Sequence, residues 1–307
     1  MRIGLNAGLG RNATLDDLLT QIAAAERDGF ASVWVSNIFS FDALMLLALA
    51  GSHTQTIELG TAVVPTYPRH PSALAQQALT AQAATGNRLA LGIGLSHKVV
   101  IEGMLGLSYT KPIRHMREYL AVLNALLSGN PASFQGEEYR VNAQLSVPGT
   151  KAPPVLVAAL GEQMLKLAGA QSDGTVVWMG GAKYLGETAV PSIAKAAREA
   201  GRAAPRIVAG FPVAVTAKTD AARLSASKVF AVYAQLPSYR AVLDIEGAAG
   251  AADVALIGSE EEVAAQVKRL ADAGVTDFTA ALYDVRDDPE ARERTYRFMS
   301  ALAKDAG

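Results

Sequence analysis

Eight short runs of apolar, often β-branched residues alternate along this 307-residue chain with longer segments of helical periodicity. Such an alternation indicates βα units and a parallel sheet. Because eight is the number of parallel strands that closes a barrel, we predict an α/β fold, a (β/α)8 TIM barrel. The predicted strands are Ile3–Ala7, Ser32–Ser36, Ile57–Val64, Leu89–Gly94, Val155–Ala159, Thr175–Met179, Ile207–Val215 and Phe278–Tyr283.

The segments between these runs carry residues that favour the starts and ends of helices. Thr14 precedes a helix with Asp16 and Asp17 in its first turn, and Pro71 opens another, where its missing N–H costs little. Several segments end at glycine, which readily takes a left-handed cap. The predicted helices are Leu15–Arg27, Phe41–Ala50, Pro71–Ala84, Ile113–Leu127, Gly161–Ala170, Gly186–Ala200, Ala221–Ala234, Glu260–Ala273 and Pro289–Ala303.

Two long connections interrupt the short βα rhythm. One spans residues 133–154 and contains a predicted hairpin at Phe134–Tyr139, and the other spans residues 239–257. Barrels of this type routinely exceed 250 residues as one unit, so we expect a single domain over residues 1–307. Insertions of this length in a barrel usually act as lids or substrate-binding segments.

Composition excludes several classes of function. Lys and Arg total 28 and Asp and Glu total 29, so no basic field attracts nucleic acid or a membrane surface. There are no cysteines, which removes disulfides, thiolate catalysis and cysteine-bound metals. The first residues read as a strand and lack the features of a signal peptide, and no apolar run is long enough to cross a membrane. We expect a cytoplasmic protein acting on a small-molecule substrate.

The active site of such a barrel lies at the carboxyl ends of its strands. At the fourth strand, Gly92–His97 combines two glycines, a hydroxyl and an imidazole, and glycines let the backbone approach a flat ring closely. At the fifth, the free N–H groups around Gly161, Glu162 and Gln163 suit a phosphate. Both patterns are also common in barrels that bind nothing there.

Single residues leave similar alternatives open. His97 is a candidate catalytic group, or an ordinary loop histidine, and Trp178 is a cofactor wall, or a packing residue. The four histidines do not form a metal-binding pattern, so we expect no metal site. No G-x-S-x-G motif is present, which argues against hydrolase chemistry.

Several stretches, in order along the chain, resemble the luciferase-like, flavin-dependent oxidoreductase family. The family is a (β/α)8 barrel that commonly dimerises, so the resemblance implies this fold and a homodimer. The matching stretches are Leu59–Thr66 with Arg69–Pro71, Asn87–Gly94, Gly136–Tyr139, Ala168–Gly174 and Gly258–Val263.

Thr66–Pro71 and Gly94–His97 most resemble the family branch that uses coenzyme F-420, an 8-hydroxy-5-deazaflavin. The resemblance implies hydride transfer between the deazaflavin and an organic substrate. It also implies a non-proline cis peptide between Ala62 and Val63, and Arg69, Lys98 and Arg114 as cations for the acidic tail of the cofactor. The implied cofactor-binding residues are Asn37, Ala62, Val63, Gly94, Leu95, Ser96, Ala159, Gly161, Glu162, Gln163 and Trp178, with His97 as the catalytic candidate.

The sequence departs from one member of that branch, a glucose-6-phosphate dehydrogenase. That enzyme has an acidic residue and a histidine where Asn37 and Ile38 stand, and a glutamate at the position of His97. Glucose 6-phosphate is therefore not the expected substrate. Two alternatives remain: an FMN-dependent monooxygenase of the same fold, and a flavin-binding barrel without catalysis.

Overall fold

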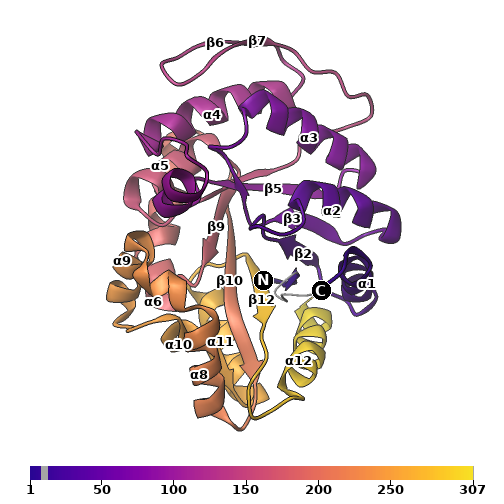
Figure 1. Cartoon of the computed structure of the whole chain (residues 1–307), viewed down its shortest axis with the longest axis vertical. Coiled ribbons are helices and arrows are strands. Elements are labelled where there is room, and N and C mark those ends of the chain that lie inside the picture. The colour runs from indigo at the N-terminus through magenta and orange to yellow at the C-terminus, as the bar shows by residue number, and fades with distance from the viewer. Residues whose placement is uncertain (8–12, 307) are drawn as a thin grey trace.

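The computed structural model describes residues 1–7 and 13–306, and its strands form the predicted barrel (Figure 1). Eight parallel strands form a ring in the order β1, β2, β3, β5, β8, β9, β10 and β12, and β12 pairs with β1. Two short strands, β4 and β11, pair with β5 and β10. The strands are β1 (Arg2–Ala7), β2 (Ser32–Val35), β3 (Glu58–Thr61), β4 (Val64–Pro65), β5 (Leu89–Gly94), β8 (Val155–Ala158), β9 (Gly174–Trp178), β10 (Arg206–Val215), β11 (Leu256–Gly258) and β12 (Asp277–Leu282).

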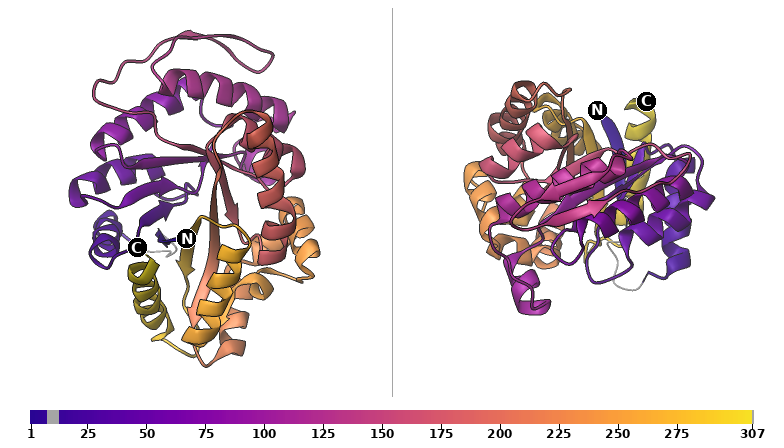
Figure 2. Two further views of the ribbon diagram at one scale, coloured as in Figure 1. Left: turned by 180° about the vertical axis from the view of Figure 1, so that it is seen from behind. Right: turned by 90° about the horizontal axis from the view of Figure 1, so that it is seen from above.

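Helices surround the ring, and an antiparallel hairpin of β6 (Ala132–Gln135) and β7 (Arg140–Ala143) lies outside it, over α4 (Figures 1 and 2). In the described ranges, none of the helices is both long and apolar enough to cross a membrane. The α-helices are α1 (Leu15–Arg27), α2 (Ala43–Ala50), α3 (Pro71–Ala84), α4 (Pro112–Leu127), α5 (Glu162–Gln171), α6 (Ala182–Tyr184), α7 (Val190–Glu199), α8 (Thr219–Val229), α9 (Pro237–Glu246), α10 (Ala251–Val254), α11 (Glu260–Asp272) and α12 (Ala291–Ala306). Shorter turns are η1 (Gly51–His53), η2 (Val99–Met104), η3 (Leu185–Ala189) and η4 (Ala231–Gln235).

The eight predicted barrel strands are confirmed, with boundaries that differ by a residue or two except at the third. There the expected strand 57–64 divides into β3 and β4, and the cis peptide expected between Ala62 and Val63 lies at the break. The expected helix 186–200 begins instead as α6 and the π turn η3 before α7. Sequence periodicity missed η2, α9 and α10, which fill the connections after β5 and β10.

The barrel interior is packed around an indole ring. Alternate strand residues face inward, and one cluster joins five strands: Trp34, Ala90, Leu156, Val176 and Val208. Trp34 is fully buried, and its Nε1–H donates to the Ser32 hydroxyl at 3.0 Å. On the neighbouring strand Gly60 pairs with Trp34, and a Cβ there would overlap the indole. Glycine at this position is therefore a packing requirement.

The amino end of the barrel is closed by an ion-pair network. Arg206 of β10 reaches Glu58 of β3 at 2.8 Å and Asp277 of β12 at 2.6 Å, and Arg2 of β1 joins the same carboxylates. Burial works against the charge of Arg206, but the hydrogen bonds that it donates to Glu58 and Asp277 outweigh this effect and raise the pKa of its guanidinium. These ion pairs occupy the amino end of the barrel, so we look for a ligand site at the carboxyl ends of the strands.

Replacing Gly60 with Ala tests this packing. The added methyl group collides with the Trp34 ring, so we expect the free energy of unfolding to fall by about 1–3 kcal/mol. Urea denaturation measures the change, and the double variant Gly60→Ala/Trp34→Phe should recover part of it. The control is Gly103→Ala in η2, where a Cβ meets nothing within 4 Å. Equal losses in the two single variants would contradict the packing argument.

Candidate functional site

The candidate ring-binding residues lie at the ends of neighbouring strands. Ala62 and Val63 follow β3, are partly buried, and pack against the interior cluster around Trp34. Gly94 ends β5, and a Cβ there would come within 2.7 Å of the Val63 side chain and 3.1 Å of the Ala158 methyl group. The absence of a side chain at Gly94 thus lets β4, β5 and β8 approach one another beneath the site.

The chain turns sharply after Gly94 and presents His97. Leu95 is half-buried, and Ser96 has a positive φ of 60°, which is uncommon for a serine. The half-buried ring of His97 lies 5.9 Å from the ring of Tyr239 on α9. Burial lowers the pKa of His97 below its ordinary value and raises the pKa of Tyr239. At neutral pH His97 is therefore a neutral imidazole beside a protonated phenol.

An aromatic wall continues from Tyr239 to the end of β9. Tyr239 packs edge-on against Tyr233 at 4.9 Å, and Tyr233 lies 6.1 Å from Trp178, which also meets Phe230 at 5.8 Å. Trp178 covers Gly210 of β10, since a Cβ there would come within 2.9 Å of the indole. The wall joins residues from β9, η4 and α9 on one side of the strand ends.

Two buried polar atoms at the strand ends lack a hydrogen-bond partner within the described part of the chain. They are Nε1 of Trp178 on β9 and Oδ1 of Asn6 on β1. Asn6 pairs in register with the inward-facing Trp34, so its side chain also faces the barrel interior. An unpaired buried polar group costs about 1–3 kcal/mol, so both atoms suit the polar group of a ligand.

The start of α5 offers backbone N–H groups. Ala159 is buried, whereas Gly161, Glu162 and Gln163 are exposed, and the N-cap residue Gly161 has no side chain to occupy these donors. The Tyr184 hydroxyl donates to the Leu160 carbonyl at 2.6 Å and holds the turn. The Glu162 carboxylate is paired with Lys166 at 2.6 Å.

The segment after β2 combines an amide side chain with exposed hydrophobic residues. The Asn37 side-chain oxygen accepts the backbone N–H of Ala43 at 3.0 Å and so caps the start of α2. The next two residues, Ile38 and Phe39, have exposed fractions of 57% and 67%. Ile38 and Phe39 therefore present hydrophobic side chains at a position where the related glucose-6-phosphate dehydrogenase has a histidine.

The three expected tail-binding cations are engaged with carboxylates. Arg69 pairs with Asp42, and Arg114 pairs with Glu137 and Glu138 of the hairpin turn, outside the ring. Lys98 forms an exposed pair with Glu102 at 3.6 Å, and such a pair contributes little. Of the three, Lys98 is the one that remains readily accessible to an anionic ligand.

A buried polar cluster lies beside the site, where β4 meets α4. His115 contacts the Thr66 hydroxyl through Nε2 at 2.9 Å and the Tyr139 hydroxyl through Nδ1 at 3.3 Å, and Tyr67 stacks on it at 3.9 Å. Burial lowers the pKa of His115 to about 4, although the carboxylates of Glu138 and Glu118 oppose this shift. The sequence showed His115 only as a helix residue.

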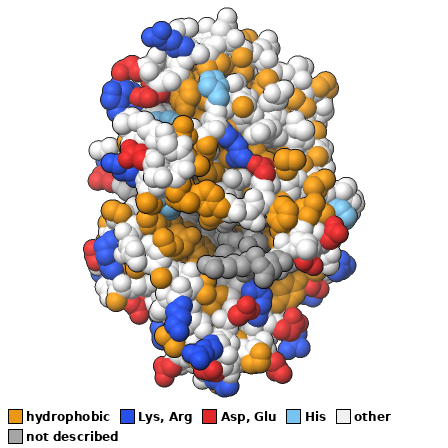
Figure 3. Space-filling model, in the orientation of Figure 1, with side chains coloured by type: hydrophobic (Ala, Val, Ile, Leu, Met, Phe, Trp, Pro, Cys, Tyr) orange, Lys and Arg blue, Asp and Glu red, His pale blue; other side chains and the backbone are white. Residues whose placement is uncertain are grey.

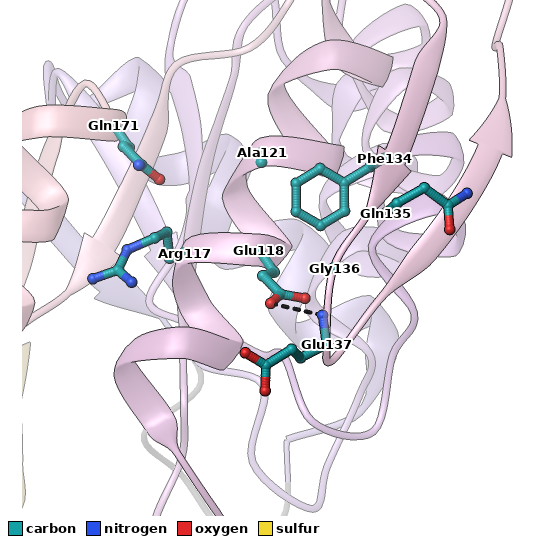
Figure 4. Close-up of a pocket in the computed structure, with 8 residues that line it drawn as sticks. All are labelled: Arg117, Glu118, Ala121, Phe134, Gln135, Gly136, Glu137 and Gln171. Carbon is teal, nitrogen blue, oxygen red and sulfur yellow. Dashed lines mark hydrogen bonds between the residues drawn. The ribbon is translucent and has the colours of Figure 1, made fainter.

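A surface groove of about 610 Å³ lies elsewhere, between α4 and the hairpin (Figure 4). Its lining includes Phe134, Arg117 and Glu118, whose carboxylate accepts the backbone N–H of Glu137 at 3.1 Å. Glu118 also accepts from the next two backbone N–H groups, which fastens the hairpin to α4. The groove thus belongs to the outer layer, and we do not assign the chemistry to it.

Comparison with known proteins identifies relatives across most of the chain. A family model described as luciferase-like monooxygenase matches residues 2–277. An uncharacterized protein of Mycobacterium tuberculosis is 31% identical over 239 residues, which cover 73% of this chain and 70% of that one. A coenzyme F-420-dependent glucose-6-phosphate dehydrogenase of Beutenbergia cavernae is 29% identical over 97% of this chain and 88% of its own.

Solved structures share the fold. The coenzyme F-420-dependent tetrahydromethanopterin reductase of Methanopyrus kandleri superposes with a TM-score of 0.79, over 99% of each chain, at 22% sequence identity. At this level of identity the likeness supports the architecture alone.

Groups of three or more possible metal ligands are absent from residues 1–7 and 13–306.

The buried histidine predicts a pH-dependent stability. An unfolded chain protonates His115 near pH 6.5, whereas the folded chain resists protonation down to about pH 4. The free energy of unfolding should therefore fall as the pH drops through this window, by up to about 3 kcal/mol. Denaturation of His115→Gln at several pH values should show a shallower acid slope than wild type, and the exposed His53→Gln an unchanged one. Identical slopes for wild type and His115→Gln would refute the assignment.

Proposed function

Because the chain belongs to the luciferase-like monooxygenase family, we propose that it is an oxidoreductase that uses coenzyme F-420 on a small organic substrate. The observation that carries this proposal is the arrangement of Ala62–Val63, Gly94 and His97 at adjacent strand ends, in a sequence similar to coenzyme F-420-dependent relatives. When bound, the deazaflavin accepts or donates a hydride. The residues of the chain bind the cofactor and the substrate and exchange the proton.

The cofactor ring is proposed to lie across the ends of β3, β5 and β9. Ala62 and Val63 support one face, while Gly94, Leu95 and Ser96 line its edge with backbone and a small hydroxyl. Trp178 and Asn37 bound the site at β9 and β2. The unpartnered Nε1 of Trp178 fits a ligand with hydrogen-bond acceptors, as a deazaflavin ring or a substrate oxygen provides.

The cofactor phosphate is proposed to bind at the start of α5. Ala159 supports the turn, and the N–H groups at Gly161, Glu162 and Gln163 point along the positive end of the helix dipole. Pairing of Glu162 with Lys166 reduces repulsion between its carboxylate and the phosphate. The negative charge of the phosphate would then lie at the positive end of the helix dipole, where it is stabilised.

His97 is proposed to exchange a proton with the substrate. Its lowered pKa keeps it neutral at pH 7, the form that accepts a proton from a hydroxyl group. The protonated Tyr239 beside it is suited to hold the imidazole in place. His97 therefore acts as a general base when an alcohol is oxidised, and as the conjugate acid in reduction.

An FMN-dependent monooxygenase is the second candidate, since the matching family model bears that description. A flavin-binding barrel without catalysis is the third, and it would bind cofactor without any turnover.

We further propose a single domain over residues 1–307, with the insertions near residues 133–154 and 239–257 serving the site. We also propose a homodimer, as the family resemblance implies, and a cytoplasmic location.

Fluorescence titration of the purified protein with each oxidised cofactor tests the choice. Coenzyme F-420 should bind at least about tenfold more tightly than FMN, a difference of about 1.4 kcal/mol. Lys98→Gln should weaken coenzyme F-420 but not FMN, since only the former carries an acidic tail. The control is Lys268→Gln on α11, which breaks a similar exposed i,i+4 pair. Equal affinities, or a preference for FMN, would promote the monooxygenase.

The role of His97 is tested by His97→Ala. Turnover should fall by about a hundredfold or more with cofactor affinity intact, because a general base supplies a factor of this size. In wild type, alcohol oxidation should decline as the pH falls through the pKa of His97, which burial places below the ordinary value of a histidine, because the imidazole then becomes protonated. His53→Ala serves as the control. Unchanged turnover in His97→Ala would leave His97 as a loop residue.

A further inference from the structure

The loops around the strand ends expose many large hydrophobic side chains. On the face seen in Figure 3, hydrophobic side chains gather near the middle. Most of the exposed large hydrophobic residues of the described chain lie in two connections, the one after β2 and the one after β5. We define the apolar rim as these six residues, each with an exposed fraction between 38% and 67%: Ile38, Phe39, Phe41, Val99, Met104 and Leu105.

The loop after β4 contacts residues next to each of the two parts of the apolar rim. Asp42, beside the first part, pairs with Arg69, which follows β4. In the same loop Tyr67 packs against Tyr109 at 5.0 Å and donates to the Thr110 carbonyl at 3.0 Å, just beyond the second part. The loop after β4 therefore links the two parts of the rim. It lies close in sequence to Ala62–Val63 at the end of β3.

The rim offers no uncompensated charge to a ligand. Residues 36–45 contain one charged side chain, Asp42, and it is paired with Arg69. Residues 95–107 contain two, Lys98 and Glu102, and they pair with each other. With Arg69 paired to Asp42 and Lys98 proposed above to bind the acidic tail of the cofactor, these two segments leave no further lysine or arginine for a phosphate or carboxylate on the substrate.

Beneath the rim the site offers a few polar groups and no free charge. The indole N–H of Trp178 is a donor and the amide oxygen of Asn6 an acceptor, both buried and unpartnered among the described residues. An alcohol hydroxyl can accept from the indole N–H and donate to the amide oxygen or to neutral His97, whereas a carbonyl oxygen can only accept, from the indole N–H. Large exposed apolar patches on soluble proteins commonly mark binding sites.

From these observations, and resting on the proposed function, we propose that the substrate is an uncharged, predominantly hydrophobic alcohol or ketone. Its carbon chain lies against the apolar rim, and its oxygen is directed toward the indole N–H of Trp178 and toward His97, with the amide oxygen of Asn6 as a further acceptor for the hydroxyl of the alcohol. The rim is thus the specificity determinant, and it selects against sugar phosphates and organic acids.

Binding of a homologous series measures this preference directly. The probes are the 2-alkanols from 2-butanol to 2-octanol and the matching ketones, with hexanoate and hexyl phosphate as charged counterparts. Dissociation constants come from tryptophan fluorescence and thermal shift, with and without coenzyme F-420. Affinity should rise about two- to fourfold for each added methylene, as expected for methylene burial. The charged probes should bind at least about tenfold more weakly than 2-hexanol.

Variants assign the effect to the rim. Phe39→Ser and Met104→Ser should flatten the dependence on chain length and leave coenzyme F-420 affinity unchanged. Leu224→Ser on α8 removes an equally exposed leucine from outside the rim and should leave the dependence intact. Circular dichroism confirms that each variant is folded.

Three results would overturn the proposal: no dependence on chain length in wild type, tighter binding of the charged probes, or equal flattening by Leu224→Ser. Loss of a dimer in sedimentation of the rim variants, without a change in probe binding, would also overturn it, because the rim would then be a subunit interface. Since the probes are also titrated without cofactor, failure of coenzyme F-420 to bind is recorded separately and bears on the proposed function alone.

Discussion

The indole of Trp34 fills the barrel interior, and much of the rest of the structure depends on how the neighbouring strands accommodate it. Gly60 makes room for the ring, the Ser32 hydroxyl accepts its N–H, and the side chains of four other strands pack against it. Below this layer the ion pairs of Arg206 close the amino end. The interior is consequently solid, and ligands are confined to the loops at the opposite end. The packing around Trp34 and the ion pairs of Arg206 together support the placement of the proposed site at the carboxyl ends of the strands.

Above that layer the site is built from contrasting environments. Burial keeps His97 neutral, so that it is ready to accept a proton, while Tyr239 retains its proton beside it. Exposed hydrophobic loops and internally paired charges surround them. These surroundings support the proposed transfer of a hydride and a proton and the proposed preference for an uncharged substrate. The same dry surroundings strengthen any hydrogen bond that Trp178 or Asn6 makes to a ligand.

The sequence predicted the fold far better than the site. Strand positions follow from local apolar runs, and the family resemblance placed the break between Ala62 and Val63. By contrast, Arg69 and Arg114 were expected to be available to an anion, and the structure pairs each with a carboxylate distant in sequence. Asp42 and Arg69 are 27 residues apart, and Arg114 and Glu138 are 24 apart. Nothing in the local pattern around either arginine reveals these partners.

By itself, the sequence determined the number, order and type of the barrel elements, because hydrophobic periodicity and helix signals act over a few neighbouring residues. It also determined which loops reach the carboxyl ends of the strands, since this follows from strand direction. Only the tertiary structure decided that Tyr239 faces His97 and that His115 is enclosed by Thr66, Tyr139 and Tyr67. The tertiary structure also left one polar atom each of Asn6 and Trp178 without a hydrogen-bond partner among residues 1–7 and 13–306. Such contacts depend on how distant segments pack, and packing sets burial, pKa and hydrogen bonding.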